Sequence, residues 1–149
     1  MKELGSGAEG FVFASPSSTA IKVFTHREKF EHELAAYERL LEHDVIDVLG
    51  FAVPRLVGSD ANLLVIEMTI VQPPFILDFA QSTIDEPHDF AEDVMEEWWE
   101  RVAEQFGDRF QIVQELFFEL QQKHGIYYFD LAPRNIHFRE EDEPPRVSS

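Results

Sequence analysis

Hydrophobic and polar positions along this chain follow two different periods. Short apolar or alternating runs, typical of strands, lie at 11–14, 20–24, 53–58, 62–68 and 135–138. Apolar residues recur at helical spacing in three longer segments, 28–42, 90–106 and 110–124. Gly107 and Gly125 directly follow two of these segments, as expected of helix stops. The pattern predicts one α+β domain over residues 1–149.

A break in the chain divides this domain into two parts. Gln72 is followed by Pro73 and Pro74, which interrupt regular structure. The segments before the break are mostly strand-like, and the long segments after it are helical. We therefore expect a strand-rich part over 1–71 and a helical part over 72–149.

Composition narrows the class of protein. The chain has 149 residues, 44% of them hydrophobic, which is enough for one domain with its own core. No apolar run approaches the ~20 residues of a membrane-spanning helix. The absence of cysteine excludes disulfides and thiol catalysis, and the net charge of −17 opposes binding to nucleic acid or anionic lipid. We expect a cytoplasmic protein that binds neither nucleic acid nor a membrane.

The segment 127–136 carries the most informative side chains. An apolar run leads into Asp130, and Asn135 follows five residues later, so both side chains can project from one loop. This arrangement suits phosphoryl transfer, in which one carboxylate orients the attacking hydroxyl and a nearby oxygen ligand holds a magnesium ion. The same spacing also occurs in ordinary surface turns between strands.

Three glycines near the N-terminus form a second candidate site. Gly5, Gly7 and Gly10 belong to the pattern Gly-x-Gly-x-x-Gly-x-Val, which ends at Val12. A strand-like run follows them, whereas a Rossmann fingerprint opens a helix, and no Gly-Lys-Ser/Thr completes a P-loop. A hairpin folded over nucleotide phosphates fits better, because glycine lets backbone amides approach the oxygens closely. A flexible turn without a ligand is the alternative.

A lysine in the middle of an apolar strand is the third feature. Alternation puts Lys22 on the same strand face as Ala20 and Phe24, a place where lysine needs an anionic partner. The helix 28–42 offers Glu33, which can face the lysine, with Glu31 and Glu38 as alternatives. The apolar stripe of this helix is expected at Phe30, Leu34, Tyr37 and Leu41. An edge-strand lysine that opposes aggregation is the other interpretation.

These motifs, in this order, resemble the protein-kinase superfamily. The glycine pattern, a strand similar to Val-Ala-Ile-Lys, a helix glutamate and an Asp-Leu-x-x-x-Asn loop occur in kinases in the same sequence. The resemblance implies a kinase-like α+β fold, with an antiparallel N-lobe sheet and one helix followed by a partial helical C-lobe. It also implies ATP and Mg²⁺ as ligands.

The resemblance assigns a role to each motif. Asp130 would orient the acceptor hydroxyl, and Asn135 would bind one magnesium ion. Lys22, held by Glu33, would contact the α- and β-phosphates. Arg134 could balance charge on the γ-phosphate.

The remaining implied contacts surround the nucleotide. The glycine hairpin through Val12 would cover it. The strand end at 66–69 resembles the kinase hinge, so the Glu67 carbonyl and the Thr69 amide would contact the adenine edge, with Ile66 at the rear of the pocket.

The chain departs from the family in two places. Tyr128 and Phe129 replace the histidine and arginine that precede the family's aspartate. No Asp-Phe-Gly follows Asn135, although its aspartate is a magnesium ligand in kinases. The acidic residues 140–143 stand beside two prolines and are typical of a solvated turn. We therefore expect a kinase-like domain that is incomplete at its C-terminus, whether by truncation or by nature.

Three functions fit these observations. The first is an ATP-binding, kinase-like protein with doubtful catalysis that acts through a partner. The second is the N-terminal portion of an active protein kinase or small-molecule phosphotransferase. The third is an acidic interaction protein on the same scaffold that binds no nucleotide. For the first, we expect an exposed apolar surface around Phe117, Phe118 and Leu120, available to a protein partner or to self-association through the helix 110–124.

Overall fold

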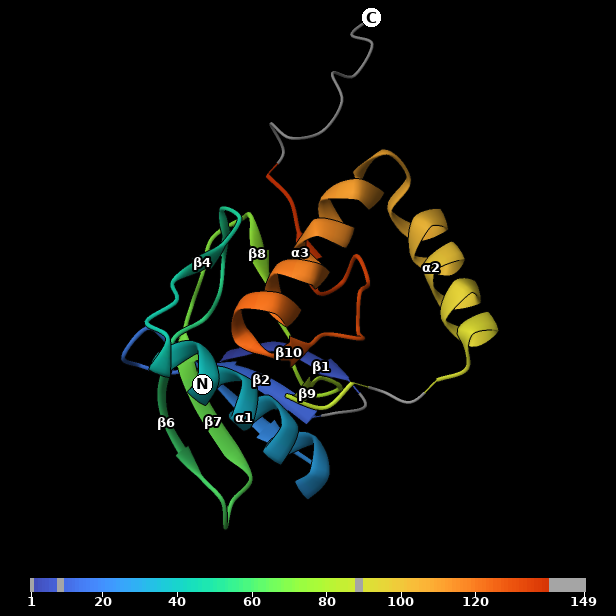
Figure 1. The fold of residues 1–149 in the computed structure, drawn as a ribbon. Coiled ribbons are helices and arrows are strands. Elements are labelled where there is room, and N and C mark those ends of the chain that lie inside the picture. Colours follow the sequence, from blue (N-terminus) through green and yellow to red (C-terminus); the bar gives the residue numbers. More distant parts are fainter. Residues whose placement is uncertain (1, 8–9, 88–89, 140–149) are drawn as a thin grey trace, which may run out of the picture.

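The computed structural model describes residues 2–7, 10–87 and 90–139. These residues form a mixed α+β structure of helices and sheets whose strand pairs are antiparallel, except for the parallel pair of Phe51–Ala52 with Phe75–Ile76 (Figure 1). No helix within these ranges is long and apolar enough to cross a membrane.

The largest sheet contains five strands in the order β1-β2-β3-β7-β6, and every neighbouring pair is antiparallel. The strands are β1 (Lys2–Gly7), β2 (Gly10–Ala14), β3 (Thr19–Phe24), β6 (Leu56–Asp60) and β7 (Val65–Thr69). The glycine pattern therefore forms the β1–β2 hairpin, and the predicted lysine strand lies at the centre of the sheet.

Helix α1 (Arg27–Glu42) packs against this sheet. As predicted, Ala20, Lys22 and Phe24 share the buried face of β3. The predicted stripe of α1 is wrong at its end, because Leu41 is exposed and Leu40 is buried instead. Because Glu33 is buried, the buried face continues from it at helical spacing to Leu40 and not to Leu41. The buried residues of α1 are Phe30, Glu33, Ala36, Tyr37 and Leu40.

Two small sheets join segments that lie far apart in the chain. One has the order β11-β8-β5-β4, and the other pairs β9 with β10. Their bounds are β4 (Asp47–Val48), β5 (Phe51–Ala52), β8 (Phe75–Ile76), β9 (Thr83–Ile84), β10 (Ile126–Tyr127) and β11 (Ile136–His137). Strand β8 directly follows the predicted break, and it runs antiparallel to β11, which follows the Asp130 loop. This pairing brings the residues after β8 to that loop.

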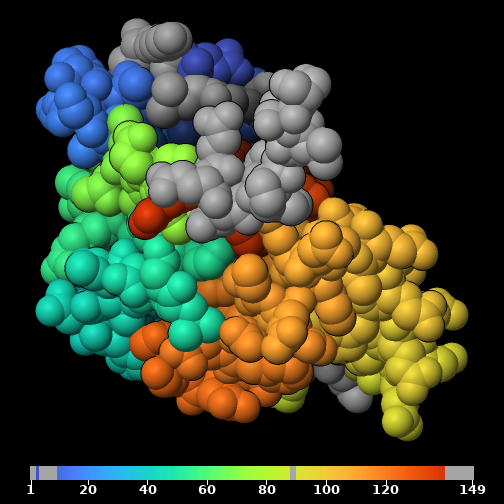
Figure 2. Space-filling model, turned by 90° about the horizontal axis from the view of Figure 1, so that it is seen from above, coloured from blue at the N-terminus to red at the C-terminus, as the bar shows by residue number. Residues whose placement is uncertain are grey.

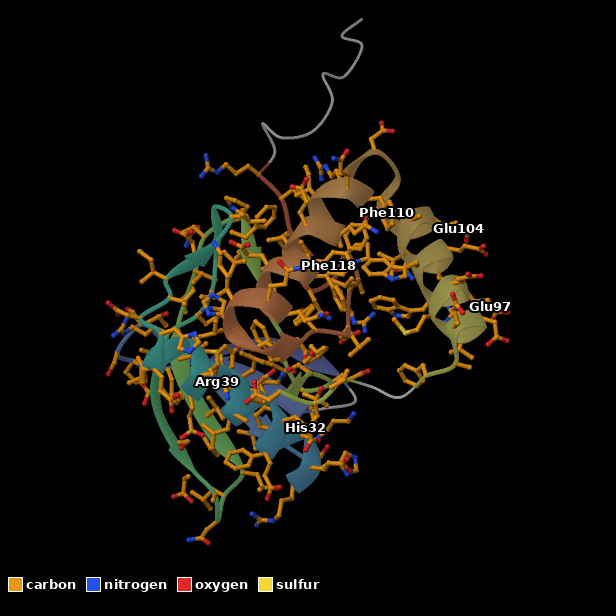
Figure 3. All side chains as sticks on the ribbon, in the orientation of Figure 1. His32, Arg39, Glu97, Glu104, Phe110 and Phe118 are labelled. Carbon is orange, nitrogen blue, oxygen red and sulfur yellow. The ribbon has the colours of Figure 1, made fainter. Side chains whose placement is uncertain are left out.

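Helices α2 (Glu92–Phe106) and α3 (Phe110–His124) are linked by a 3₁₀ turn, η1 (Gly107–Arg109). Both predicted helix stops are confirmed, since Gly107 and Gly125 follow the helices with positive φ. At Gly125 a Cβ would also lie 2.2 Å from Asp85 Oδ1. The outer face of α2 is acidic, and Glu97 and Glu104 project from it away from α3 (Figure 3).

The predicted apolar surface on α3 is largely wrong. Phe117 is 3% exposed and Leu120 is 1% exposed, while Phe118 is 39% exposed. Helix α2 covers this face, with the rings of Trp98 and Trp99 lying 5.6 and 5.1 Å from the Phe117 ring. The chain thus covers α3 with a helix that precedes it, and needs no later helix for this purpose.

Candidate functional site

The predicted lysine–glutamate pair forms. Lys22 Nζ, from the middle of β3, lies 3.1 Å from Glu33 Oε1 on the second turn of α1. Glu33 is fully buried, and the same oxygen accepts a hydrogen bond from the Phe79 amide at 2.8 Å. Glu31 and Glu38, the alternatives from the sequence, have no such contact among those that the described residues show. The pair ties the central strand to the helix.

Burial makes the carboxyl group of Glu33 a weaker acid than an exposed glutamate. Its pKa is raised from 4.5 to about 7, chiefly because burial disfavours the charged carboxylate, with the negative Asp78 nearby adding to the rise. The positive charge of Lys22 lowers the pKa but only partly offsets these causes. Within the described residues, Glu33 Oε2 has no hydrogen-bond partner. A proton can therefore be gained or lost at the centre of the site near neutral pH.

A second carboxylate, which the sequence analysis missed, faces the same lysine. Asp78 Oδ1 lies 3.7 Å from Lys22 Nζ. Asp78 adopts a left-handed conformation (φ 64°) just after β8, and its Oδ1 accepts a hydrogen bond from the Ala80 amide at 3.2 Å. The sequence signal was present in the apolar run that ends in Asp-Phe-Ala at 78–80. It was missed because the kinase order places this aspartate after Asn135.

The two neighbours of Asp78 in the chain, Leu77 and Phe79, contact the segment that carries Asp130. The Leu77 amide donates to the Asn135 carbonyl at 2.8 Å, and the Tyr128 hydroxyl donates to the Leu77 carbonyl. Phe79 packs edge-on between Tyr37 of α1 and Tyr128, with ring centroids 5.3 and 5.0 Å apart. Tyr128, which stands where kinases have histidine, therefore joins the residues on either side of Asp78 to the loop.

The predicted loop residues lie together. Asp130 Oδ1 accepts from Arg134 at 2.6 Å, and its Oδ2 accepts from Asn135 Nδ2 at 2.8 Å. Asn135 Nδ2 also donates to the Asp130 carbonyl at 3.1 Å, which turns the amide oxygen of Asn135 away from Asp130. Both Asp130 and Asn135 are buried, whereas Arg134 is exposed. The loop is thus held in one conformation by its own side chains.

The glycine hairpin borders the lysine. Val12 of β2 lies opposite Lys22 of β3 in the sheet register. At Gly10 (φ 146°) a Cβ would lie 1.9 Å from the Val23 carbonyl oxygen, so this glycine is required by the sheet itself. Gly5 and Gly7 belong to β1, which pairs with β2, and the tip at residues 8–9 lies outside the described residues.

The predicted hinge residues are already engaged in the sheet. Glu67 pairs with Ile21 on one side and with Gly58 on the other, and its side chain accepts from the Thr19 hydroxyl at 2.5 Å. The Thr69 amide donates to the Arg55 carbonyl at 2.9 Å. An adenine contact at Thr69 would require Arg55 to release this amide. Ile66 is fully buried.

Comparison of the chain with protein-family models, curated proteins and solved structures finds no match. Among residues 2–7, 10–87 and 90–139, no group of three or more histidine, aspartate or glutamate side chains is arranged to hold a metal ion alone. The acids at 140–143 lie outside these ranges. What the described chain gathers is one lysine, two aspartates, one glutamate and one asparagine.

Proposed function

We propose that this protein is a kinase-like, ATP-binding domain whose site can transfer the γ-phosphoryl group to an acceptor hydroxyl. The observation that carries the proposal is the position of Lys22 between Glu33 and Asp78, at 3.1 and 3.7 Å. A buried lysine flanked by two carboxylates is suited to a phosphate-bearing ligand that can take over part of the lysine's charge. The cytoplasm, where magnesium-bound ATP is available, is the proposed location.

The proposed kinase-like site depends on which segments are neighbours in the folded structure and not on their order in the chain. In kinases the magnesium-binding aspartate follows the catalytic loop, whereas Asp78 precedes Asp130 by 52 residues, since 130 − 78 = 52. The strand before Asp78 (β8) and the strand after Asn135 (β11) are nevertheless antiparallel neighbours. In such a pair, the residues that follow β8 and the residues that precede β11 lie at the same end, whichever strand comes first in the chain. The absence of Asp-Phe-Gly after Asn135 therefore does not argue against catalysis.

The donor atoms suit magnesium held jointly with phosphates. Mg²⁺ prefers oxygen ligands and binds to nucleotide enzymes through one or two carboxylates together with phosphate oxygens and water. Asp78 and the amide oxygen of Asn135 would hold it, and the bound ion would neutralise charge on the phosphates. Asp130 would orient the acceptor hydroxyl and accept its proton, while Lys22 would hold phosphate oxygens.

One set of contacts favours a second candidate, an interaction protein on this scaffold that binds no nucleotide. The Thr69 amide is bonded to Arg55, and both carboxylate oxygens of Asp130 are bonded within the loop. A site whose groups satisfy one another can persist without a ligand. The −17 charge would then serve the recognition of a basic partner.

Thermal unfolding with and without magnesium-ATP distinguishes the two. At a hundred times its dissociation constant, a ligand that binds only the folded state stabilises it by about 2.7 kcal/mol. We expect such a rise in the wild type and in Lys29→Ala, and its loss in Lys22→Ala. A well-folded wild type that ATP does not stabilise would contradict the proposal and favour the interaction protein.

A further inference from the structure

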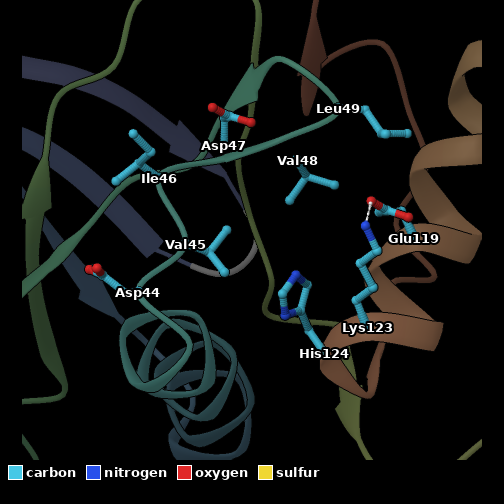
Figure 4. Close-up of a pocket in the computed structure, with 9 residues that line it drawn as sticks. All are labelled: Asp44, Val45, Ile46, Asp47, Val48, Leu49, Glu119, Lys123 and His124. Atoms are coloured by element: carbon cyan, nitrogen blue, oxygen red, sulfur yellow. Dashed lines mark ion pairs between the residues drawn. The ribbon is translucent and has the colours of Figure 1, made fainter.

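A groove outside the Lys22 site lies between the β4–β5 hairpin and the C-terminal end of α3. It encloses about 380 Å³. In Figure 4, Val48 and Leu49 lie on the hairpin side, opposite Glu119, Lys123 and His124 of α3. The space-filling view shows the hairpin region in teal against the orange surface of α3 (Figure 2). None of the residues that line this groove belongs to the proposed nucleotide site.

The turn of the β4–β5 hairpin, at the edge of this groove, contains a leucine in a backbone conformation that leucine rarely adopts. Leu49 (φ 51°) and Gly50 (φ 87°) are both left-handed, as in the hairpin turns that favour Asn-Gly. A bulky side chain is unfavourable in this conformation, whereas asparagine tolerates it. Leu49 is 49% exposed, so burial within the described chain compensates only part of this strain. A strained residue without a structural reason indicates a functional one.

A second exposed side chain lies in the same segment. Ile46 is 66% exposed and lines the groove together with Leu49, while Val48 is buried behind them. Two large, exposed aliphatic side chains on one short hairpin form an apolar rim, which is typical of a surface that another molecule covers.

The lining of the groove includes one acid outside the local ion pairs. Asp44 pairs with Arg55 at 3.2 Å and Glu119 with Lys123 at 2.8 Å, whereas Asp47 is exposed and takes part in no ion pair among the described residues. Burial and nearby cations lower the pKa of His124, so its ring adds no charge at neutral pH. The chain as a whole carries −17. A second copy would be repelled, whereas a basic partner would be attracted.

We propose that this groove docks a segment of a protein partner that packs a large apolar side chain on the rim formed by Ile46 and Leu49 and presents lysine or arginine residues to Asp47. The apolar side chain would relieve the exposure of the two aliphatic residues. The basic residues would face Asp47, which lines the groove and is exposed. The proposal does not depend on nucleotide binding.

Selection from a random library of 12-residue peptides displayed on phage tests this docking. Leu49→Asn removes the apolar rim, and Leu63→Asn, at an exposed leucine of the β6–β7 turn, is the matched control. We expect peptides selected on the wild type to share a large apolar residue flanked by lysine or arginine. Synthetic copies should bind wild type and Leu63→Asn alike, and Leu49→Asn at least about tenfold more weakly.

Melting temperature separates this loss from a folding defect. Asparagine suits the left-handed turn, so Leu49→Asn should unfold about 2–4 °C higher than the wild type while losing the peptide. The proposal is overturned if no peptide is recovered, if recovered peptides lack basic residues, or if they bind Leu49→Asn as tightly as wild type. Self-association that Leu49→Asn abolishes would also overturn it, because a second copy would then be the occupant.

Discussion

At the scale of single residues, Glu33 and Tyr128 hold the site together. Glu33 contacts both the strand lysine and the amide of Phe79, so one carboxyl joins β3, α1 and the Asp78 segment. Tyr128 joins the same segment to the loop of Asp130. Each residue is fully or almost fully buried, and removal of one of its polar atoms leaves a partner unsatisfied. Each therefore gives a measurable prediction.

The raised pKa of Glu33 predicts a specific pH dependence of stability. Between its unfolded pKa of 4.5 and its folded pKa of about 7, the folded state binds a proton that the unfolded state lacks. Stability from this group is thus fully present below pH 4.5 and is lost as the pH rises through 7. We expect the stability of the wild type relative to Glu33→Gln to fall by about 2–3 kcal/mol between pH 5 and 7.5. Urea unfolding across this range measures it, and a pH-independent difference would contradict a titrating Glu33.

Removal of the Tyr128 hydroxyl should destabilise the fold. Tyr128→Phe leaves the Leu77 carbonyl without its donor while keeping the ring that packs on Phe79. An unsatisfied buried carbonyl costs about 1–3 kcal/mol, so we expect a loss of that size in chemical denaturation. Tyr127→Phe, at the less buried neighbouring tyrosine, is the control and should have little effect. Equal losses in the two variants would mean that the Leu77 bond contributes nothing.

At the scale of elements, aromatic packing and a polar contact hold the helices in place. Phe129, directly before Asp130, packs against Trp98 of α2 and Phe117 of α3 at 5.5 and 5.6 Å. Residue 129 is arginine in the kinase pattern, so this chain uses the position for packing. At the other end of α3, Arg39 of α1 donates to the His124 carbonyl at 2.8 Å, which links the two helices.

The contact between α1 and α3 should weaken in acid. His43 Nδ1 and His124 Nδ1 lie 2.7 Å apart, a hydrogen bond that requires one ring nitrogen to be unprotonated. The pKa of His124 is lowered by burial and by the nearby positive charges of His43, Lys123 and Arg39, with Glu119 opposing them. Below pH 6.5, the pKa of this histidine in the unfolded state, the unfolded state therefore binds more protons at this ring than the folded state does. The stability that the neutral ring contributes is present above pH 6.5 and is lost as the pH falls below it.

Variants of His124 test this dependence. We expect the stability difference between wild type and His124→Gln to shrink as the pH falls from 7.5 to 5.5. Gln122→Ala, which removes no titratable group from an exposed position of α3, should show no such trend. Thermal unfolding in matched buffers measures both. A difference that grows in acid would mean that the folded state favours the protonated ring.

At the scale of the whole molecule, local signals predicted the long elements and the paired charges. Periodic apolar residues and stop glycines give α3 its observed bounds, and alternation in β3 gives the inward direction of Lys22. Strand β11 lies within the strand-like run predicted at 135–138. Strand β8 could not be predicted, because it is defined by pairing across 60 residues of chain (136 − 76 = 60) and not by local pattern. Asp78 was missed although Asp-Phe-Ala stands in the sequence, because only the β8–β11 pairing places the residues after β8 beside Asn135.

The proposed place of Asp78 in a kinase-like site, ahead of the Asp130 loop in the chain, is tested most directly by the magnesium dependence of ATP binding. Isothermal titration of ATP, with and without Mg²⁺, should compare the wild type with Asp78→Asn and with Asp93→Asn, an exposed aspartate of α2. We expect Mg²⁺ to tighten binding in the wild type and in Asp93→Asn. Asp78→Asn should lose at least about tenfold of the magnesium-dependent affinity, or 1.4 kcal/mol. Unchanged magnesium-dependent binding in Asp78→Asn would show that Asp78 does not complete the site.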